Sequence, residues 1–244
     1  MIRAVLFDID DTLCDDTGHF TGAARRVAAI AQAEFPSLAE GALAETYLGV
    51  SDHYWTREIA LTAPEPLAMV RERLWRRAFS LLGIDPPAHV LQGVLVEYAR
   101  LRLEVLPELH DGALDVLTTL RSQEVRVGLV TNGLSETHVS KATRLGLLAH
   151  AETFLMPDRI GWAKPHPKVF EIACRELGVQ PNQTLHVGDS LSADVGGAKA
   201  AGCGAIWFNP HGKPHPGGEH PVPDRVIDSL RKVPDVAAGW FASG

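Results

Sequence analysis

The stretch AVLFDIDDTLCDD, residues 4–16, places five aspartates directly behind a short apolar run. A continuous apolar segment that ends in polar residues is typical of a buried parallel strand, and residues 3–7 (RAVLF) fit this pattern. Open α/β sheets bind their ligands at the carboxyl ends of such strands. Crowded carboxylates repel one another. The stretch is therefore either a solvated acidic turn or a place where a positive group belongs.

The apolar pattern recurs further along the chain. It is found at residues 125–130, 184–187 and 205–208, and a shorter candidate lies at 225–227. Helical patterns separate these segments, at 112–123, 135–145, 167–177 and 191–201. Strands that alternate with helices predict an α/β fold with a doubly wound parallel sheet and right-handed crossovers.

Residues 17–106 interrupt this alternation. They contain helical patterns rich in Ala, Leu and Arg, such as GAARRVAAIAQAEF and LAMVRERLWRRAFSLL, and no strand pattern. We therefore expect two parts. Residues 1–14 and 107–244 form an α/β catalytic core, and residues 15–106 form an inserted α-helical subdomain.

The composition restricts the class of protein. The 244 residues are 45% hydrophobic and 22% charged, as in globular proteins, and the net charge of -7 argues against a general nucleic-acid binder. No apolar run is long enough for a spanning helix, and Asp8 interrupts the N-terminal apolar stretch too early for a signal peptide. The three cysteines are widely scattered, which favours a reducing, cytoplasmic location.

Asp8 and Asp10 share one face if the extended chain continues past residue 7. Two such carboxylates can bind a hard cation, or act as a nucleophile and a proton donor. Alone, this pair is equally well explained as an acidic loop.

Polar residues also follow the other predicted strands. Thr131 and Asn132 come after residue 130, at a position that suits an oxyanion, and the segment GDSLSAD carries Asp189 and Asp194 after residue 187. Lys164 lies in the proline-containing loop between them. Each group by itself could be a helix cap or a solvated charge. Their recurrence at converging strand ends favours a functional site.

In their order and spacing these segments resemble the motifs of the haloacid dehalogenase superfamily. DIDDT matches the D-x-D-x-T motif, Thr131 with Asn132 the second motif, Lys164 the third, and GDSLSAD the fourth. The match spans residues 2–209 or so. The helical insertion resembles the cap of the subclass that carries its cap after the first motif. At Asp11 many relatives carry glycine.

The resemblance implies a role for each matching position. Asp8 would be the nucleophile, and Asp10 would protonate the leaving oxygen and later activate water. Mg²⁺ would be bound by the Asp8 and Asp189 carboxylates and the Asp10 backbone carbonyl, with Asp194 in its outer shell.

The remaining motif residues would handle the phosphate. Thr131, Asn132 and Lys164 would bind it, and Lys164 would also balance charge on the transferring group. Thr12 would support the turn of the first motif. The implied protein is a Mg²⁺-dependent phosphatase for a small phosphomonoester, such as a sugar phosphate or nucleotide. It would be a monomer or homodimer that binds neither nucleic acid nor membrane.

Asp10 favours a phosphatase over a dehalogenase, because a halide leaves without needing a proton. The absence of lysine from residues 17–106 argues against the phosphonate-cleaving branch, which uses a cap lysine. A phosphomutase of the same superfamily remains an alternative. A non-catalytic regulatory or binding protein on the same fold is a further alternative, although such a protein would ordinarily have lost one of these acids.

Overall fold

The structure, a computed structural model, describes residues 1–59 and 65–240. It divides into two compact units, one formed by Met1–Asp15 with Glu108–Gly244 and the other by Asp16–Pro107. Among the described residues, every strand belongs to the first unit, and the second unit is helical. We call them the sheet unit and the helical unit.

The sheet unit contains a six-stranded sheet in the order β3-β2-β1-β4-β5-β6, and every pairing is parallel. The strands are β1 (Ala4–Phe7), β2 (Arg126–Val130), β3 (Thr153–Leu155), β4 (Thr184–Gly188), β5 (Gly204–Phe208) and β6 (Arg225–Ile227). The prediction of a doubly wound parallel α/β sheet is confirmed. The sequence pattern found the three-residue β6 and missed β3, which has the same length, because so short a segment gives only a weak pattern.

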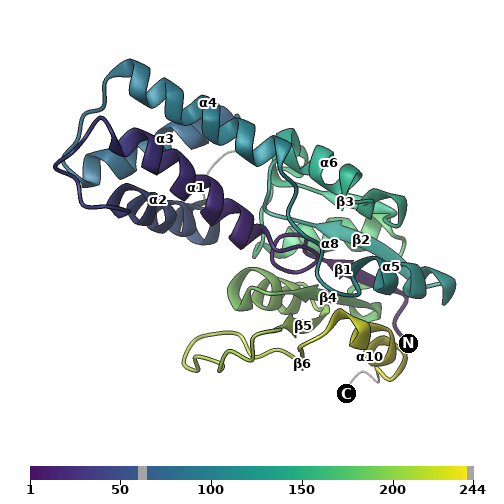
Figure 1. Ribbon diagram of the computed structural model, residues 1–244. Coiled ribbons are helices and arrows are strands. Elements are labelled where there is room, and N and C mark those ends of the chain that lie inside the picture. Colours follow the sequence, from purple (N-terminus) through teal and green to yellow (C-terminus); the bar gives the residue numbers. More distant parts are fainter. Residues whose placement is uncertain (60–64, 241–244) are drawn as a thin grey trace. The chain divides into compact units, whose positions relative to one another are not determined.

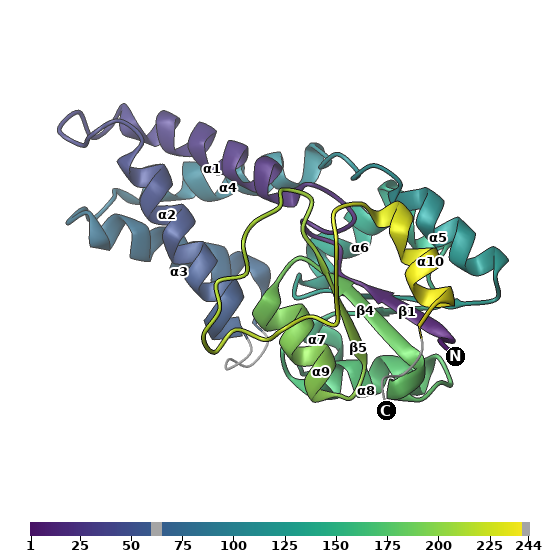
Figure 2. The same ribbon diagram turned by 90° about the horizontal axis from the view of Figure 1, so that it is seen from below.

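Helices cover both faces of this sheet, as Figure 2 shows for α5 and α10 on one face and α8 and α9 on the other. The helices of the unit are α5 (Ala113–Ser122), α6 (Ser135–Arg144), α7 (Pro157–Ile160), α8 (Pro167–Glu176), α9 (Gly197–Ala200) and α10 (Val233–Ala238). The single helix expected at 191–201 is instead a π-helix, η5 (Leu191–Gly196), followed by α9. The α8 face packs apolar residues of β1, β2 and β5 into one core.

The strand order creates a switch point between β1 and β4. The chain leaves β1, builds β2 and β3 on one side, and returns to β4 on the other, so that purple β1 and green β4 lie side by side in Figure 1. Phe7 pairs with Val187, and the Asp8 backbone N–H donates to the Val187 carbonyl at 3.0 Å. Open α/β sheets bind ligands at such a point.

The helical unit packs four long helices around an aromatic core. They are α1 (Asp16–Gln32), α2 (Ala42–His53), α3 (Leu67–Leu81) and α4 (Ala88–Glu104). Tyr47 of α2 stacks on Trp75 of α3 with ring centroids 3.7 Å apart, and Tyr98 of α4 meets both rings edge-on. In the described part of the chain, no helix is long and apolar enough to cross a membrane.

Candidate active site

Asp8 lies immediately after β1, where a tight turn redirects the chain. The Asp11 backbone N–H donates to the Cys14 carbonyl at 2.7 Å. Asp11 adopts a φ of +57°, in the left-handed region that glycine enters freely and that Asp tolerates better than most residues. The turn therefore explains why this position can carry either glycine or aspartate.

Lys164 joins two of the predicted acids. Its Nζ lies 2.7 Å from Asp8 Oδ1 and 2.7 Å from Asp194 Oδ1, and its side chain is buried. Burial alone would lower the pKa of Lys164, but the neighbouring Asp194 and Asp8 carboxylates outweigh burial and raise it. Lys164 is therefore a fixed positive charge between the two carboxylates.

Asp194 accepts hydrogen bonds on both carboxylate oxygens. Its Oδ1 receives Lys164 Nζ and also lies 2.8 Å from His186 Nε2, and its Oδ2 accepts from the Ser190 backbone N–H at 3.0 Å. Burial opposes its ionisation, but Lys164 and His186 outweigh burial and lower the pKa of Asp194. Asp194 is thus an ionised, fully buried counter-charge for Lys164.

The pKa values of Asp8 and Asp189 are raised, whereas that of Asp194 is lowered. Burial, with repulsion from Asp194 and Asp10, raises the pKa of Asp8 to about 8 although Lys164 opposes the shift. Burial, with repulsion from Asp194 and Asp8, raises the pKa of Asp189 well above its ordinary value. If all three acids were ionised, their negative charge would exceed what Lys164 balances, and for this reason Asp8 and Asp189 hold their protons to higher pH.

A divalent cation fits this imbalance. Asp8, Asp189 and Asp194 each offer a carboxylate oxygen, and these oxygens lie within 4.8 Å of one another. Hard oxygen ligands with few carboxylates suit Mg²⁺. Because Asp194 already accepts from three donors, Asp8 and Asp189 are better placed as direct ligands and Asp194 as an outer partner.

The carboxylate and backbone of Asp189 are both held in place. Trp207 Nε1 of β5 donates to the Asp189 carbonyl oxygen at 2.8 Å, and the fully buried Thr12 donates from Oγ1 to Asp189 Oδ1 at 3.5 Å. Thr12 thus links the turn after β1 to the loop after β4.

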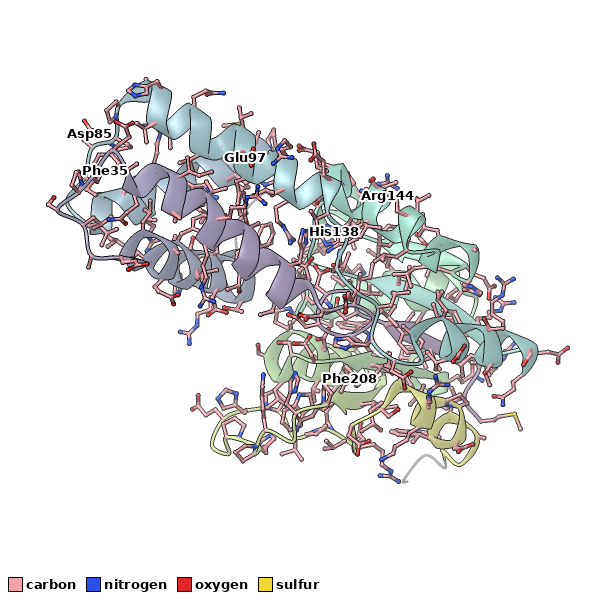
Figure 3. All side chains as sticks on the ribbon, in the orientation of Figure 1. Phe35, Asp85, Glu97, His138, Arg144 and Phe208 are labelled. Carbon is pink, nitrogen blue, oxygen red and sulfur yellow. The ribbon has the colours of Figure 1, made fainter. Side chains whose placement is uncertain are left out.

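Asp10 meets two basic side chains of α6 that the sequence reasoning missed. His138 Nε2 lies 2.8 Å from Asp10 Oδ2, and Lys141 Nζ donates to Asp10 Oδ1. Figure 3 labels His138 on this helix. His138 and Lys141 are three residues apart and so share a helix face, which is the signal that could have found them.

The TNG segment after β2 serves the site in two ways. The side-chain amide of Asn132 donates to the Lys164 carbonyl at 2.9 Å and accepts from the Lys164 backbone N–H at 2.8 Å. Gly133 gives room to His138, since a Cβ there would lie 2.0 Å from that ring. Thr131 is buried and its Oγ1 accepts from the Gly133 N–H at 3.0 Å. Phosphate binding by Thr131 and Asn132 stays a prediction.

The GDS segment after β4 depends on close packing. A Cβ on Gly188 would lie 2.2 Å from Asp194 Cγ, so only glycine lets that carboxylate approach the strand end. His186, on β4 itself, was missed because it stood inside an apparently apolar strand. The predicted residues Asp8, Lys164, Asp189 and Asp194 therefore converge, and Asp10 lies beside them with partners of its own.

Comparisons with known proteins agree with this geometry. The family model of haloacid dehalogenase-like hydrolases matches residues 2–202. The chain is 33% identical to a glyceraldehyde 3-phosphate phosphatase of Methanopyrus kandleri, over 97% of each sequence. It is 29% identical to a phosphoserine phosphatase of Thermus thermophilus, over 95% of this chain and 98% of the relative.

A solved structure shares the fold. The HAD-hydrolase YfnB of Bacillus subtilis, solved with bound magnesium, superposes with a TM-score of 0.74 at 22% identity, over 97% of this chain and 99% of the other. One conclusion follows from the motif residues, from their convergence at the switch point and from these similarities. The protein belongs to the haloacid dehalogenase-like hydrolase family, and its relatives place it among the phosphatases of that family.

Proposed function

We propose that the protein is a Mg²⁺-dependent phosphatase that hydrolyses a small phosphomonoester through an aspartyl-phosphate on Asp8. The observation that supports this most strongly is the placement of Lys164 Nζ, 2.7 Å from Asp8 Oδ1, beside the carboxylate of Asp189. A nucleophile, a fixed cation and a cation-binding pair thus meet at one point. Bound Mg²⁺ supplies positive charge that screens Asp8 from the incoming phosphate.

In the first step an oxygen of Asp8 attacks phosphorus, and the bond from phosphorus to the leaving oxygen breaks. Asp10, in its carboxylic acid form, gives its proton to that oxygen. Lys164 stabilises the negative charge that spreads over the transferring group. Thr131 and Asn132 are proposed to bind phosphate oxygens from the loop after β2.

In the second step Asp10 is a carboxylate and accepts a proton from water, which attacks the phosphorus of the aspartyl-phosphate. The bond from phosphorus to Asp8 breaks, and inorganic phosphate leaves. His138 Nε2 and Lys141 Nζ contact the two oxygens of Asp10 and hold its carboxyl group in place for both proton transfers.

We further propose that the helical unit is the cap that selects the leaving group. Its place in the sequence, directly after the turn that carries Asp8 and Asp10, supports this role. Because curated relatives are named for glyceraldehyde 3-phosphate and phosphoserine, three-carbon phosphate esters are the first substrates to test.

The test measures phosphate release from three-carbon, sugar and nucleoside monophosphates, with Mg²⁺ and with a chelator in excess. We expect Mg²⁺-dependent release that D8N abolishes. D15N, which changes an exposed acid outside the motif, is the matched control and should retain activity. Isomerised substrate without free phosphate would indicate a mutase. Turnover that survives D8N would refute Asp8 as nucleophile.

A further inference from the structure

His186 is the fully buried histidine in the middle of β4. In the sheet it pairs with Leu6 of β1 and with Ala205 of β5, which both belong to the apolar core under α8. An aliphatic side chain is the usual occupant of such a position, since a buried polar group costs free energy unless it is hydrogen-bonded. The ring Nε2 of His186 lies 2.8 Å from Asp194 Oδ1, and this contact with a carboxylate of the site gives the histidine a reason to be there beyond the fold.

The ring of His186 is fixed in one orientation. It meets the Phe170 ring of α8 edge-on, with centroids 5.0 Å apart and planes at 77°. Because Asp194 is an acceptor, the Nε2 of His186 carries the proton and donates. Among the described residues, Nδ1 makes no hydrogen bond, which is tolerable for the bare lone pair of a neutral imidazole.

The atom that receives this bond also receives Lys164. A carboxylate turns easily about its last torsion, and a lysine has a flexible four-carbon stem. Asp194 Oδ1 lies 2.7 Å from Lys164 Nζ, and the same Nζ lies 2.7 Å from Asp8 Oδ1. The Ser190 backbone N–H holds the other oxygen, Oδ2, at 3.0 Å, and His186, a rigid donor on a central strand, fixes Oδ1, the oxygen that contacts the lysine.

We infer that His186 is a positioning residue for the reaction at Asp8, acting through Asp194 on Lys164. The expected effect on kcat rests on the proposed function, whereas the effect on the position of Lys164 does not depend on it. Outer partners of this kind typically change activity by about 10- to 100-fold, because small displacements of a reacting group are costly.

The experiment compares H186Q with H186N. The glutamine amide nitrogen occupies about the position of Nε2 and can still donate to Asp194, whereas the asparagine amide is one methylene shorter and cannot reach. The two variants bury similar polar groups. We expect H186Q to retain kcat within about threefold, and H186N to lose at least about tenfold in kcat with KM nearly unchanged.

The control is T184V, on the same strand. Thr184 is equally buried, and its hydroxyl donates to the Gln180 carbonyl at 3.0 Å, away from Lys164. T184V should lower thermal stability and leave kcat unchanged. Equal kcat in H186Q and H186N would overturn the inference.

Crystal structures of both histidine variants separate this inference from the proposed function. The distance of 2.7 Å from Lys164 Nζ to Asp8 Oδ1 should persist in H186Q and lengthen in H186N. If the parent protein releases no phosphate from any substrate, the proposed function fails. An unchanged Lys164 position in H186N overturns the inference on its own, whatever the activity.

Discussion

The side-chain amide of Asn132 makes two hydrogen bonds with the backbone of Lys164. Asn132 Nδ2 donates to the Lys164 carbonyl at 2.9 Å, and Asn132 Oδ1 accepts from the Lys164 N–H at 2.8 Å. Residues from two different loops are joined in this way. The position of the Lys164 ammonium beside Asp8 is therefore fixed at both ends, by Asn132 at the backbone and by Asp194 at the side chain.

The first prediction concerns this clamp. N132A removes two hydrogen bonds, each contributing about 1 kcal/mol. If that energy positions Lys164 in the transition state, kcat falls by about thirtyfold. N132D keeps the acceptor for the Lys164 N–H, but its second carboxylate oxygen would face the Lys164 carbonyl and repel it. The kcat of N132D should therefore be no higher than that of N132A. Steady-state kinetics check this. A loss confined to KM would show instead that Asn132 acts mainly by binding substrate in the ground state.

The second prediction tests the two roles of Asp10. In D10N no residue at this position protonates an alkoxide or activates water. With p-nitrophenyl phosphate, whose leaving group needs little protonation, Asp8 should still be phosphorylated. Rapid mixing should then show a burst of about one p-nitrophenolate per enzyme, followed by slow turnover. Glycerol phosphate, which has a poor leaving group, should give no burst. A D10N protein with full steady-state turnover would exclude Asp10 from both steps.

The third prediction follows from the pKa of Asp8. Burial and neighbouring carboxylates raise this pKa from 3.8 to about 8 in the folded protein. Stability from this group is therefore fully present below pH 3.8, and it is lost as pH rises through about 8. Without metal, Tm should fall across that window. D8N should make the fall smaller but not abolish it, because the pKa of Asp189 is raised as well.

Mg²⁺ should reverse this loss. At acidic pH it must displace a proton from Asp8, and above pH 8 it meets a carboxylate. The rise in Tm on adding Mg²⁺ should thus be larger at about pH 8.5 than at about pH 5.5. Differential scanning calorimetry measures this rise in Tm, with chelator-treated protein as the metal-free reference. An equal rise in Tm at both pH values would argue against Asp8 as a ligand of Mg²⁺.

The fourth prediction concerns the helical unit. Arg102 of α4 donates to Asp16 Oδ2 of α1 at 2.7 Å, and both side chains are nearly buried. Removing one partner of a buried pair is costly, so R102M should lower the free energy of unfolding by about 3 kcal/mol. D16N/R102M should regain much of this. R25M, which breaks the exposed Arg25–Glu45 pair, is the control and should cost under about 1 kcal/mol. Urea unfolding curves measure these free energies of unfolding. Equal losses in R102M and R25M would show that the Arg102–Asp16 pair contributes no more than an exposed pair.

The sequence by itself determined the sheet and the chemical groups at its edge. Buried strands and helices leave local hydrophobic periods, so β1, β2, β4 and β5 were visible, and the acids that follow β1 and β4 could be expected to converge. Of the two three-residue strands, β6 was expected and β3 was missed, because so short a segment gives only a weak pattern.

The tertiary structure alone decided which side chains meet. His138 and Lys141 reach Asp10 from α6, His186 reaches Asp194 across the sheet face, and Asn132 binds the Lys164 backbone. The contacts of Asp10 and of Lys164 join residues far apart in the chain, whereas His186 and Asp194 are only eight positions apart. They depend on strand register and on rotamers fixed by packing, which no local pattern encodes. A histidine inside a strand and a basic pair on a helix look ordinary in sequence, and only their three-dimensional neighbours distinguish them.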